Sequence, residues 1–213
     1  MRIIQIDPTK DFSAALQEAI KVLTYGGTVV YPTDTLYGLG ANALNEIAVR
    51  KVFAIKQRGL AKPLPIIVRD LTWAKELARI SPRNEEILRK VWPGKVTAVL
   101  PRQKIVPDAV TAGNESIGMR VVDHRFADEL LRQFGYPLTA TSANLSGDEP
   151  SLKIDEIIDI FSRTALKPDL IIDAGTLPPS SPSTVIDLTG HEPKILRVGA
   201  AKPQELLELL NGL

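Results

Sequence analysis

The sequence predicts an α/β fold in which a twisted, mixed open sheet is flanked by helices. In the first half of the chain, short apolar runs that suit strands alternate with amphipathic stretches that suit helices. In the second half, strand-like runs dominate. This order favours a mixed sheet over a uniform series of parallel strand–helix–strand units. The 213 residues, 44% of them hydrophobic and 24% charged, suit a globular protein with one large domain or two small ones.

The expected strands are short runs rich in isoleucine, valine and leucine, bounded by polar residues, glycine or proline. Pro32 ends the second run, because proline cannot donate a hydrogen bond to a neighbouring strand. The runs cover residues 2–7, 29–31, 65–68, 96–100, 117–122, 138–141, 170–173, 185–188 and 195–198.

The first four expected helices are marked by a residue that can cap their N-terminus. Asp11 is expected to cap a helix over residues 12–25, Asn45 a helix over 46–57, and Asp70 a helix over 71–79. Ser81, followed by Pro82 at the first helical position, is expected to cap a helix over 82–92. The buried face of the helix over 46–57 is expected to include Ile47. Further helices are expected over 126–134, 154–161 and 203–210.

The segment most like a linker is the proline- and serine-rich stretch 177–183. Too little chain follows it to form a second hydrophobic core, so we expect a loop over one domain. The expectation is therefore a single domain over residues 1–213, without an additional C-terminal domain.

Composition excludes several classes of function. The formal net charge is +1, so no global field favours nucleic acid or an anionic membrane. The absence of cysteine excludes disulfides, thiolate catalysis and cysteine-bound zinc. There is no apolar signal core at the N-terminus and no run as long as a membrane span. We expect a cytoplasmic protein with no metal-binding cluster of its own.

Residues 29–40 combine a buried strand with an unusual ending. Thr33, Asp34 and Thr35 follow the strand at once, and Gly38 and Gly40, which allow tight backbone turns, come next. A rigid strand that presents short polar side chains is a common wall of a small-molecule site. An ordinary turn after a strand is the alternative.

Three basic residues, Lys56, Arg58 and Lys62, cluster at the end of the helix over 46–57. Cations at a helix C-terminus are favourable because of the helix dipole alone. The same cluster, bent by glycine and proline, would also make a cradle for an anion. Arg120 and Arg197 each follow apolar residues on expected buried strands, where an arginine requires either an acidic partner or a ligand.

A second polar stretch, residues 139–147, follows another expected strand. Its hydroxyl groups, amide and glycine can surround a phosphate, or they can simply cap a helix or form a turn. Ser142 has no predicted histidine base, because His124 and His191 both lie in segments expected at the surface. Gly94-Lys95 is not a P-loop, because no serine or threonine follows it and the upstream glycine is missing. Gly38-Leu39-Gly40 is not a dinucleotide-binding fingerprint, because it starts too far beyond its strand and no acidic residue stands about twenty residues later.

Taken together, these blocks resemble the YrdC/TsaC family, in family order and over nearly the whole chain. The matching blocks are YPTDTLYGLG (31–40), KxR (56–58), KPL (62–64), WPG (92–94), SIGMRV (116–121), TSANLSG (141–147), STVIDL (183–188) and ILRxG (195–199).

The resemblance implies an L-threonylcarbamoyladenylate synthase, a nucleotidyltransferase that combines L-threonine, bicarbonate and ATP and releases pyrophosphate. The product serves the threonylcarbamoyladenosine modification of tRNA. The resemblance also implies a YrdC-like domain whose concave, basic face holds the substrates. Mg²⁺ is expected to bind through the ATP phosphates, and contact with tRNA and with other tRNA-modification proteins is an open expectation.

The resemblance assigns roles by position. The residues implied to act on the reacting phosphates are Lys56 and Arg58. Those implied to bind threonine are Thr35, Arg120, Ala140 and Ser183. Those implied to bind ATP are Arg58, Lys62, Ser116, Ser142, Asn144, Ser151 and Arg197.

Two departures keep other functions open. The segment 65–69 lacks a histidine that helps to hold threonine in some members, and Pro182 stands where many members have glutamate. The blocks around Arg120 and Ser183 also resemble YciO paralogues. The alternatives are therefore a YciO-like paralogue and an RNA-binding module without this activity.

Overall fold

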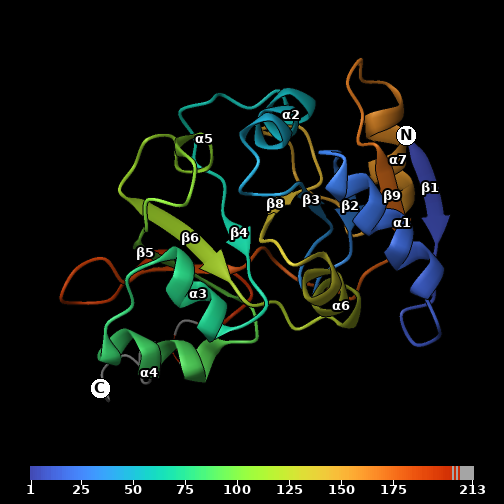
Figure 1. Cartoon of the computed structure of the whole chain (residues 1–213). Coiled ribbons are helices and arrows are strands. Elements are labelled where there is room, and N and C mark those ends of the chain that lie inside the picture. The colour runs from blue at the N-terminus through green and yellow to red at the C-terminus, as the bar shows by residue number, and fades with distance from the viewer. Residues whose placement is uncertain (203, 205, 207–213) are drawn as a thin grey trace.

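The strands form two mixed sheets that lie side by side and are flanked by helices (Figure 1). The computed structural model describes residues 1–202, 204 and 206. The first sheet has the order β1 (Arg2–Gln5), β9 (Leu170–Asp173), β2 (Val29–Tyr31), β3 (Gly38–Gly40), β8 (Thr141–Ser142). Strands β1, β9 and β2 are parallel, whereas β3 is antiparallel to both of its neighbours.

The second sheet has the order β11 (Lys194–Arg197), β10 (Thr184–Asp187), β5 (Val96–Pro101), β6 (Ser116–Arg120), β4 (Ile66–Ile67), β7 (Leu138–Thr139). Its β10–β5 and β6–β4 pairs are parallel and the other pairs are antiparallel. The predicted α/β class with mixed strand directions is therefore confirmed, with the strands divided between two sheets.

The two sheets are joined where β3 meets β7. The backbone of Thr139 donates to the carbonyl of Ala41 at 3.0 Å, and its hydroxyl accepts from the Ala41 N–H at 3.0 Å. Asn42 forms a bridge with Leu138, and the buried Tyr31 hydroxyl donates to the Thr139 carbonyl at 3.1 Å. These contacts fix the angle between the sheets, and with it the space between their strand ends.

The helices cover the outer faces of the sheets (Figure 1). In chain order they are α1 (Ser13–Thr24), α2 (Glu46–Lys56), α3 (Leu71–Leu77), α4 (Pro82–Val91), α5 (Asp108–Thr111), α6 (Arg125–Phe134) and α7 (Ile154–Ser162). Helices α1 and α6 pack together through the rings of Phe12 and Phe126, whose centroids are 5.3 Å apart. None of these helices has the length and apolar character needed to cross a membrane.

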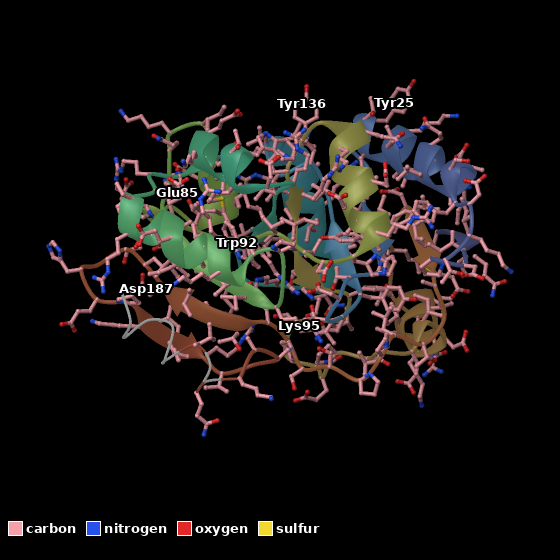
Figure 2. All side chains as sticks on the ribbon, turned by 90° about the horizontal axis from the view of Figure 1, so that it is seen from below. Tyr25, Glu85, Trp92, Lys95, Tyr136 and Asp187 are labelled. Atoms are coloured by element: carbon pink, nitrogen blue, oxygen red, sulfur yellow. The ribbon has the colours of Figure 1, made fainter. Side chains whose placement is uncertain are left out.

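Two hydrophobic cores hold these layers. The smaller one lies between α1, α6 and the strands of the first sheet, and the larger one extends from α2 under both sheets to α4 and α7. Figure 2 shows Trp92 at the end of α4, whereas Tyr25 and Tyr136 project outward at one edge of the molecule. The side chain of Trp92 is buried, and its indole N–H donates to the Val96 carbonyl at 2.8 Å.

Most expected elements are present, with three differences. Ile47 is 73% exposed, because it lies in the first turn of α2, on the face turned away from the sheets. The expected strand over 138–141 is two short strands, β7 and β8, which belong to different sheets. Helix α5 and strand β3 were not predicted. The expected helix over 203–210 lies largely outside the described residues.

The two glycines of β3 correct the sequence interpretation, which placed them in tight turns. Gly38 and Gly40 lie in a strand paired with β2, not in tight turns. The ring of Tyr31 lies across them, so that an added Cβ would be 2.9 Å from Tyr31 Cζ at Gly38 and 2.6 Å from Cε1 at Gly40. Both positions therefore require glycine because a buried aromatic ring occupies the space of a side chain.

Candidate functional site

A cavity of about 490 Å³ opens where the two sheets meet. The first sheet contributes residues of the β2–β3 connection and of β8, and the second sheet contributes residues of β5, β6, β10 and β11. The polar and charged side chains on its wall include Thr33, Thr35, Arg58, Thr97, Ser116, Arg120, Thr141, Ser142, Asn144, Asp148, Ser183 and Arg197. Small hydroxyl groups and three arginines therefore face one space.

The turn after β2 is fixed by its own side chains. The Thr33 hydroxyl donates to the Leu36 carbonyl at 2.6 Å and accepts from the backbone N–H groups of Thr35 and Leu36. With its hydrogen used in this way, Thr33 is the acceptor in its 3.2 Å contact with the Thr35 hydroxyl. The turn thus presents the Thr35 oxygen to the cavity in a fixed position.

Arg120 closes one side of the cavity through three hydrogen bonds. Its Nε donates to the Gly94 carbonyl at 2.7 Å, Nη1 to Thr35 Oγ1 at 2.8 Å, and Nη2 to Asp34 Oδ1 at 2.6 Å. The Arg120 and Asp34 side chains are only 8% and 10% exposed. Burial lowers the pKa of Arg120, and the Asp34 carboxylate opposes that shift. The acidic partner that a buried arginine requires is therefore Asp34.

Lys56 lies behind the cavity wall and holds the segment that forms it. Its buried Nζ donates to the carbonyls of Ser142 and Asn144 at 2.5 and 2.6 Å, and to Asn144 Oδ1 at 2.9 Å. Burial, together with the charge of Arg58, lowers the pKa of Lys56 to about 7. The three oxygen acceptors match the three N–H groups of an ammonium, so the geometry favours the charged form.

The same segment orients its own polar groups. The Ser142 hydroxyl donates to Asn144 Oδ1 at 2.6 Å, and Asn144 Nδ2 donates to the Asp148 carbonyl at 2.5 Å. Because Lys56 and Ser142 both donate to Oδ1, the orientation of the Asn144 amide is set. Residues 142–148 therefore form a rigid loop against the end of α2.

The other two arginines are held by neutral oxygen atoms, which are backbone carbonyls and, for Arg197, also the Ser183 hydroxyl at 3.3 Å. Arg58 donates to the Lys62 and Pro63 carbonyls at 3.2 and 3.0 Å. Arg197 donates to the Ser183 carbonyl at 3.2 Å from Nε and 2.8 Å from Nη2. Partial burial lowers the pKa of both guanidinium groups. Within the described part of the chain neither forms an ion pair with a carboxylate, so both charges are available to an anionic ligand.

The structure brings most of the sequence-predicted residues to this cavity and leaves three outside its lining. Those on the wall are Thr35, Arg58, Ser116, Arg120, Ala140, Ser142, Asn144, Ser183 and Arg197. Lys56 is buried behind the wall and Lys62 is exposed beside it. Ser151 donates to Glu156 Oε2 at 2.6 Å, at the start of α7.

Four single residues differ from the sequence prediction or had no role in it. Arg197 lies on β11, an exposed edge strand and not a buried one. His124 is not a fully exposed surface residue, because it is partly buried, and among the described residues its buried Nδ1 has no hydrogen-bond partner. Sequence reasoning noted Asp34 but assigned it no role. Thr97 was missed: its hydroxyl is 2.8 Å from that of Ser183, and a single threonine in an apolar strand gives no signal in the sequence.

Comparison with known proteins agrees with this geometry. The model of the Sua5/YciO/YrdC family, described as "Telomere recombination", matches residues 21–199. The chain is 37% identical over 189 residues to the threonylcarbamoyl-AMP synthase of Pyrococcus abyssi, covering 88% of this chain and 55% of that protein. It is 33% identical over 210 residues to the threonylcarbamoyl-AMP synthase of Bacillus subtilis, covering 94% of this chain and 59% of that protein. The chain thus spans little more than half the length of these two relatives.

Solved structures are similar over nearly the whole chain. P. abyssi Sua5 in complex with L-threonine matches with a TM-score of 0.92 at 33% identity, covering 99% of this chain and 61% of that one. E. coli YciO matches with a TM-score of 0.83 at 30% identity, covering 94% of this chain and 96% of that one.

Proposed function

The chain belongs to the Sua5/YciO/YrdC family, and we propose that it is an L-threonylcarbamoyladenylate synthase. The observation that supports this proposal most directly is the cavity between the two sheets, where Arg58, Arg120 and Arg197 converge with small hydroxyl side chains. Such a wall suits two anionic reactants, an amino acid carboxylate and a polyphosphate. Relatives named threonylcarbamoyl-AMP synthase and a relative solved with L-threonine support the choice of substrates.

The proposed reaction requires no nucleophile from the protein. The neutral amine of L-threonine forms a carbamate in one of two ways: it attacks carbon dioxide and releases a proton, or it attacks bicarbonate and releases water. A carbamate oxygen then bonds to the α-phosphorus of ATP as the bond to the bridging oxygen breaks and pyrophosphate leaves. The protein is a nucleotidyltransferase that acts by holding the reactants together and by neutralising the charge on the phosphates.

On the threonine side, we assign Arg120 to the substrate carboxylate. Its three hydrogen bonds leave two of its five N–H groups for a ligand. Thr35, the Ala140 backbone and Ser183 line the same cavity and complete the proposed threonine site. The Ser183 hydroxyl is 2.8 Å from that of Thr97, which lines the same cavity.

On the ATP side, we assign Arg58 and Arg197 to the phosphates, because their charges are not neutralised by carboxylates of the described chain. Ser116, Ser142 and Asn144 supply neutral polar groups on the same wall. Lys56 positions the loop that carries the last two. Lys62 and Ser151, which lie outside the lining, stay predictions from family resemblance.

Mg²⁺ is proposed to bind through the phosphates of ATP and to neutralise part of their charge. The residues fit this arrangement. Within the described chain, no cluster of three or more histidine, aspartate or glutamate side chains is placed to hold a metal ion. Asp148 is the only acidic residue among the described residues that line the cavity. The ion would therefore keep phosphate oxygens and water as most of its ligands.

The product is proposed to serve tRNA threonylcarbamoyladenosine modification, together with other proteins that use the adenylate. The deciding experiment measures pyrophosphate release with L-threonine, bicarbonate, ATP and Mg²⁺, omitting each in turn. We expect release to require all four. Release that is independent of threonine, or turnover only with a different amine or carbamoyl donor, would support a YciO-like paralogue. RNA binding that falls steeply with salt, without turnover, would support an RNA-binding module.

A further inference from the structure

One wall of the cavity between the sheets is a single face of the neighbouring strands β10, β5 and β6, of which β5 and β6 are labelled in Figure 1. Side chains along a strand alternate between its two faces, and every second residue here lines the cavity. The lining residues of this wall are Thr97, Val99, Ser116, Gly118, Arg120, Ser183 and Val185. The strand residues that alternate with them are absent from the lining, so the wall is one face of the second sheet.

Thr97 lies in the middle of this wall. On one side it pairs with Val185 of β10. On the other side, Ala98 pairs with Met119 of β6. Thr97 and Arg120 are the adjoining residues of these two strands, so they are neighbours across the β5–β6 pair. Since Arg120 is assigned to the substrate carboxylate, the groups on the Cα atom of the same amino acid can reach Thr97.

The Thr97 and Ser183 hydroxyl groups form a pair with one hydrogen left over. The two side chains belong to residues only 5% and 9% exposed, and their oxygens are 2.8 Å apart. Only one of the two hydroxyl hydrogens can lie between these oxygens. The other hydrogen has no acceptor among the described residues, and Arg197 contacts the pair only as a donor, to Ser183 Oγ at 3.3 Å. A buried donor requires an acceptor, so this hydrogen is available to a ligand in the cavity.

The surroundings of the hydroxyl pair are apolar and leave room for a methyl group. Val99 and Val185 flank Thr97 on the wall. Gly118 contributes no side chain, although an added Cβ would be an ordinary 3.5 Å from Thr97 Cγ2. Neither packing nor a left-handed φ therefore requires glycine there, and its effect is to keep the space beside Thr97 open.

These features match a small side chain that carries both a hydroxyl and a methyl group. A carboxylate can only accept hydrogen bonds, whereas a hydroxyl both accepts and donates. The Thr97–Ser183 pair offers one hydrogen and also has free lone pairs, so a hydroxyl group complements it fully.

We propose that Thr97 is a specificity-determining residue which, together with Ser183, binds the side-chain hydroxyl of the amino acid substrate. The substrate carboxylate is held by Arg120, and the hydroxyl is held by the pair one strand away. This inference deepens the proposed function, and it rests on that function for the identity of the cavity as an amino acid site.

The first test is titration calorimetry without ATP, with L-threonine and with L-2-aminobutyrate, which lacks only the hydroxyl. We expect wild-type protein to bind threonine about tenfold more tightly or better, because a site built for a hydroxyl loses a hydrogen bond with the analogue. Thr97→Val should lower this ratio about fivefold or more, because valine keeps the shape and removes the hydroxyl. Thr97→Ser keeps the hydroxyl and should retain the ratio within about twofold.

The matched control is Thr111→Val. Thr111 is a buried threonine on α5, outside the cavity lining, and its hydroxyl has no hydrogen-bond partner among the described residues. It should keep the wild-type ratio. If Thr97→Val does not fold, Thr97→Ala removes the same hydroxyl without placing a methyl group against Ser183, and the comparison with Thr97→Ser gives the same answer.

The outcomes separate this inference from the proposed function. Equal loss of affinity for both ligands in Thr97→Val would place the hydroxyl at the carboxylate or in the fold and would overturn the inference, as would wild-type protein that binds neither ligand. Selective, Thr97-dependent binding of threonine without threonine-dependent pyrophosphate release would keep the inference and reject the proposed function. Threonine-dependent release with an unchanged ratio in Thr97→Val would do the reverse.

Discussion

At the residue scale, the cavity depends on a few closely packed and hydrogen-bonded side chains. Tyr31 lies flat across Gly38 and Gly40, and its hydroxyl is bound to the Thr139 carbonyl. Burial raises the pKa of Tyr31 well above its ordinary range, so the hydroxyl stays protonated and can donate at neutral pH. The glycines and the ring form one unit, and the turn that carries Thr35 starts from it.

We expect Gly40→Ala to destabilise the protein by about 1–3 kcal/mol, because the new methyl group would overlap the Tyr31 ring. Urea unfolding measures the loss. Gly190→Ala is the matched control, since its nearest heavy atom would be 4.0 Å away and its φ is not left-handed. Adding Tyr31→Leu should make the effect of Gly40→Ala smaller than in the parent. A strictly additive double variant would contradict this account.

The prediction about ATP binding concerns Arg58. We expect Arg58→Met to raise the KM for ATP roughly 10- to 100-fold, which corresponds to the loss of about 1.5–3 kcal/mol from charged hydrogen bonds. The KM for threonine should change much less. Arg50→Met is the matched control, because Arg50 lies on α2, the helix that ends just before Arg58, pairs with Glu46 at the surface and is outside the cavity. Equal losses for the two substrates would contradict the division of the site.

At the element scale, helix caps and strand ends decide where the polar groups lie. Asn45 accepts from the backbone N–H groups of Ile47 and Ala48, and Asp70 accepts from that of Trp73. The α2 cap fixes the start of the helix whose last residue, Lys56, holds the loop 142–148. The ends of β2 and β6 bring Asp34 and Arg120 together across the join between the sheets.

The two caps predict different responses to pH. Partial burial raises the pKa of Asp70, but the hydrogen bonds from the Trp73 backbone and from Arg69 outweigh it, so the pKa is lowered overall. A carboxyl group whose pKa is lower in the folded than in the unfolded state stabilises the protein at pH values above its unfolded-state pKa. This stabilisation is lost as the pH falls through the folded-state pKa. Asp70→Ala should therefore cost about 1 kcal/mol at neutral pH, and the cost should shrink below about pH 4.

Asn45→Ala is the control for this titration. It should also cost about 1 kcal/mol, because it too removes an N-cap acceptor. Asn45 does not titrate, so its cost should stay constant over the same range of pH. The comparison is made by chemical denaturation of both variants and the parent between pH 3 and 7 at constant ionic strength. A cost at Asp70 that does not change with pH would argue against the charged cap.

At the scale of the whole molecule, the site exists because two sheets are held at a fixed angle. Thr139 is the central contact: its hydroxyl accepts from the Ala41 N–H and donates to the Leu39 carbonyl at 3.3 Å. Both partners belong to the β3 segment of the first sheet, whereas Thr139 belongs to β7 of the second. Loss of this contact should loosen the relation between the two walls of the cavity.

We expect Thr139→Val, which keeps the shape and removes the hydroxyl, to lower the free energy of unfolding by about 1–3 kcal/mol. Thr189→Val is the control, because that hydroxyl bonds to Asp187 at the surface and should change stability by no more than about 0.5 kcal/mol. Both are measured by urea unfolding. Equal stability of the two variants would show that the Thr139 hydroxyl does not join the sheets.

Much of the fold follows from local signals in the sequence. Caps such as Asn45, Asp70 and Ser81 stand where the helices begin, because the unpaired N–H groups of a first turn need nearby acceptors. The division into two sheets was not predicted, because strands of two residues such as β4, β7 and β8 carry too little pattern to reveal their partners. Strand β3 was missed because its glycines are typical of turns.

The sequence by itself determined the class of fold, most of the elements and their order, the resemblance to a family and nine of the residues that line the cavity. These depend on local propensity and on motifs, which a chain carries wherever it folds. Only the tertiary structure decided that Arg120 is paired with Asp34, that Lys56 supports the wall from behind, and that Gly38 and Gly40 make room for Tyr31. The physical reason is that burial, ion pairing and close packing are relations between segments far apart in sequence, and they are set when the two sheets meet.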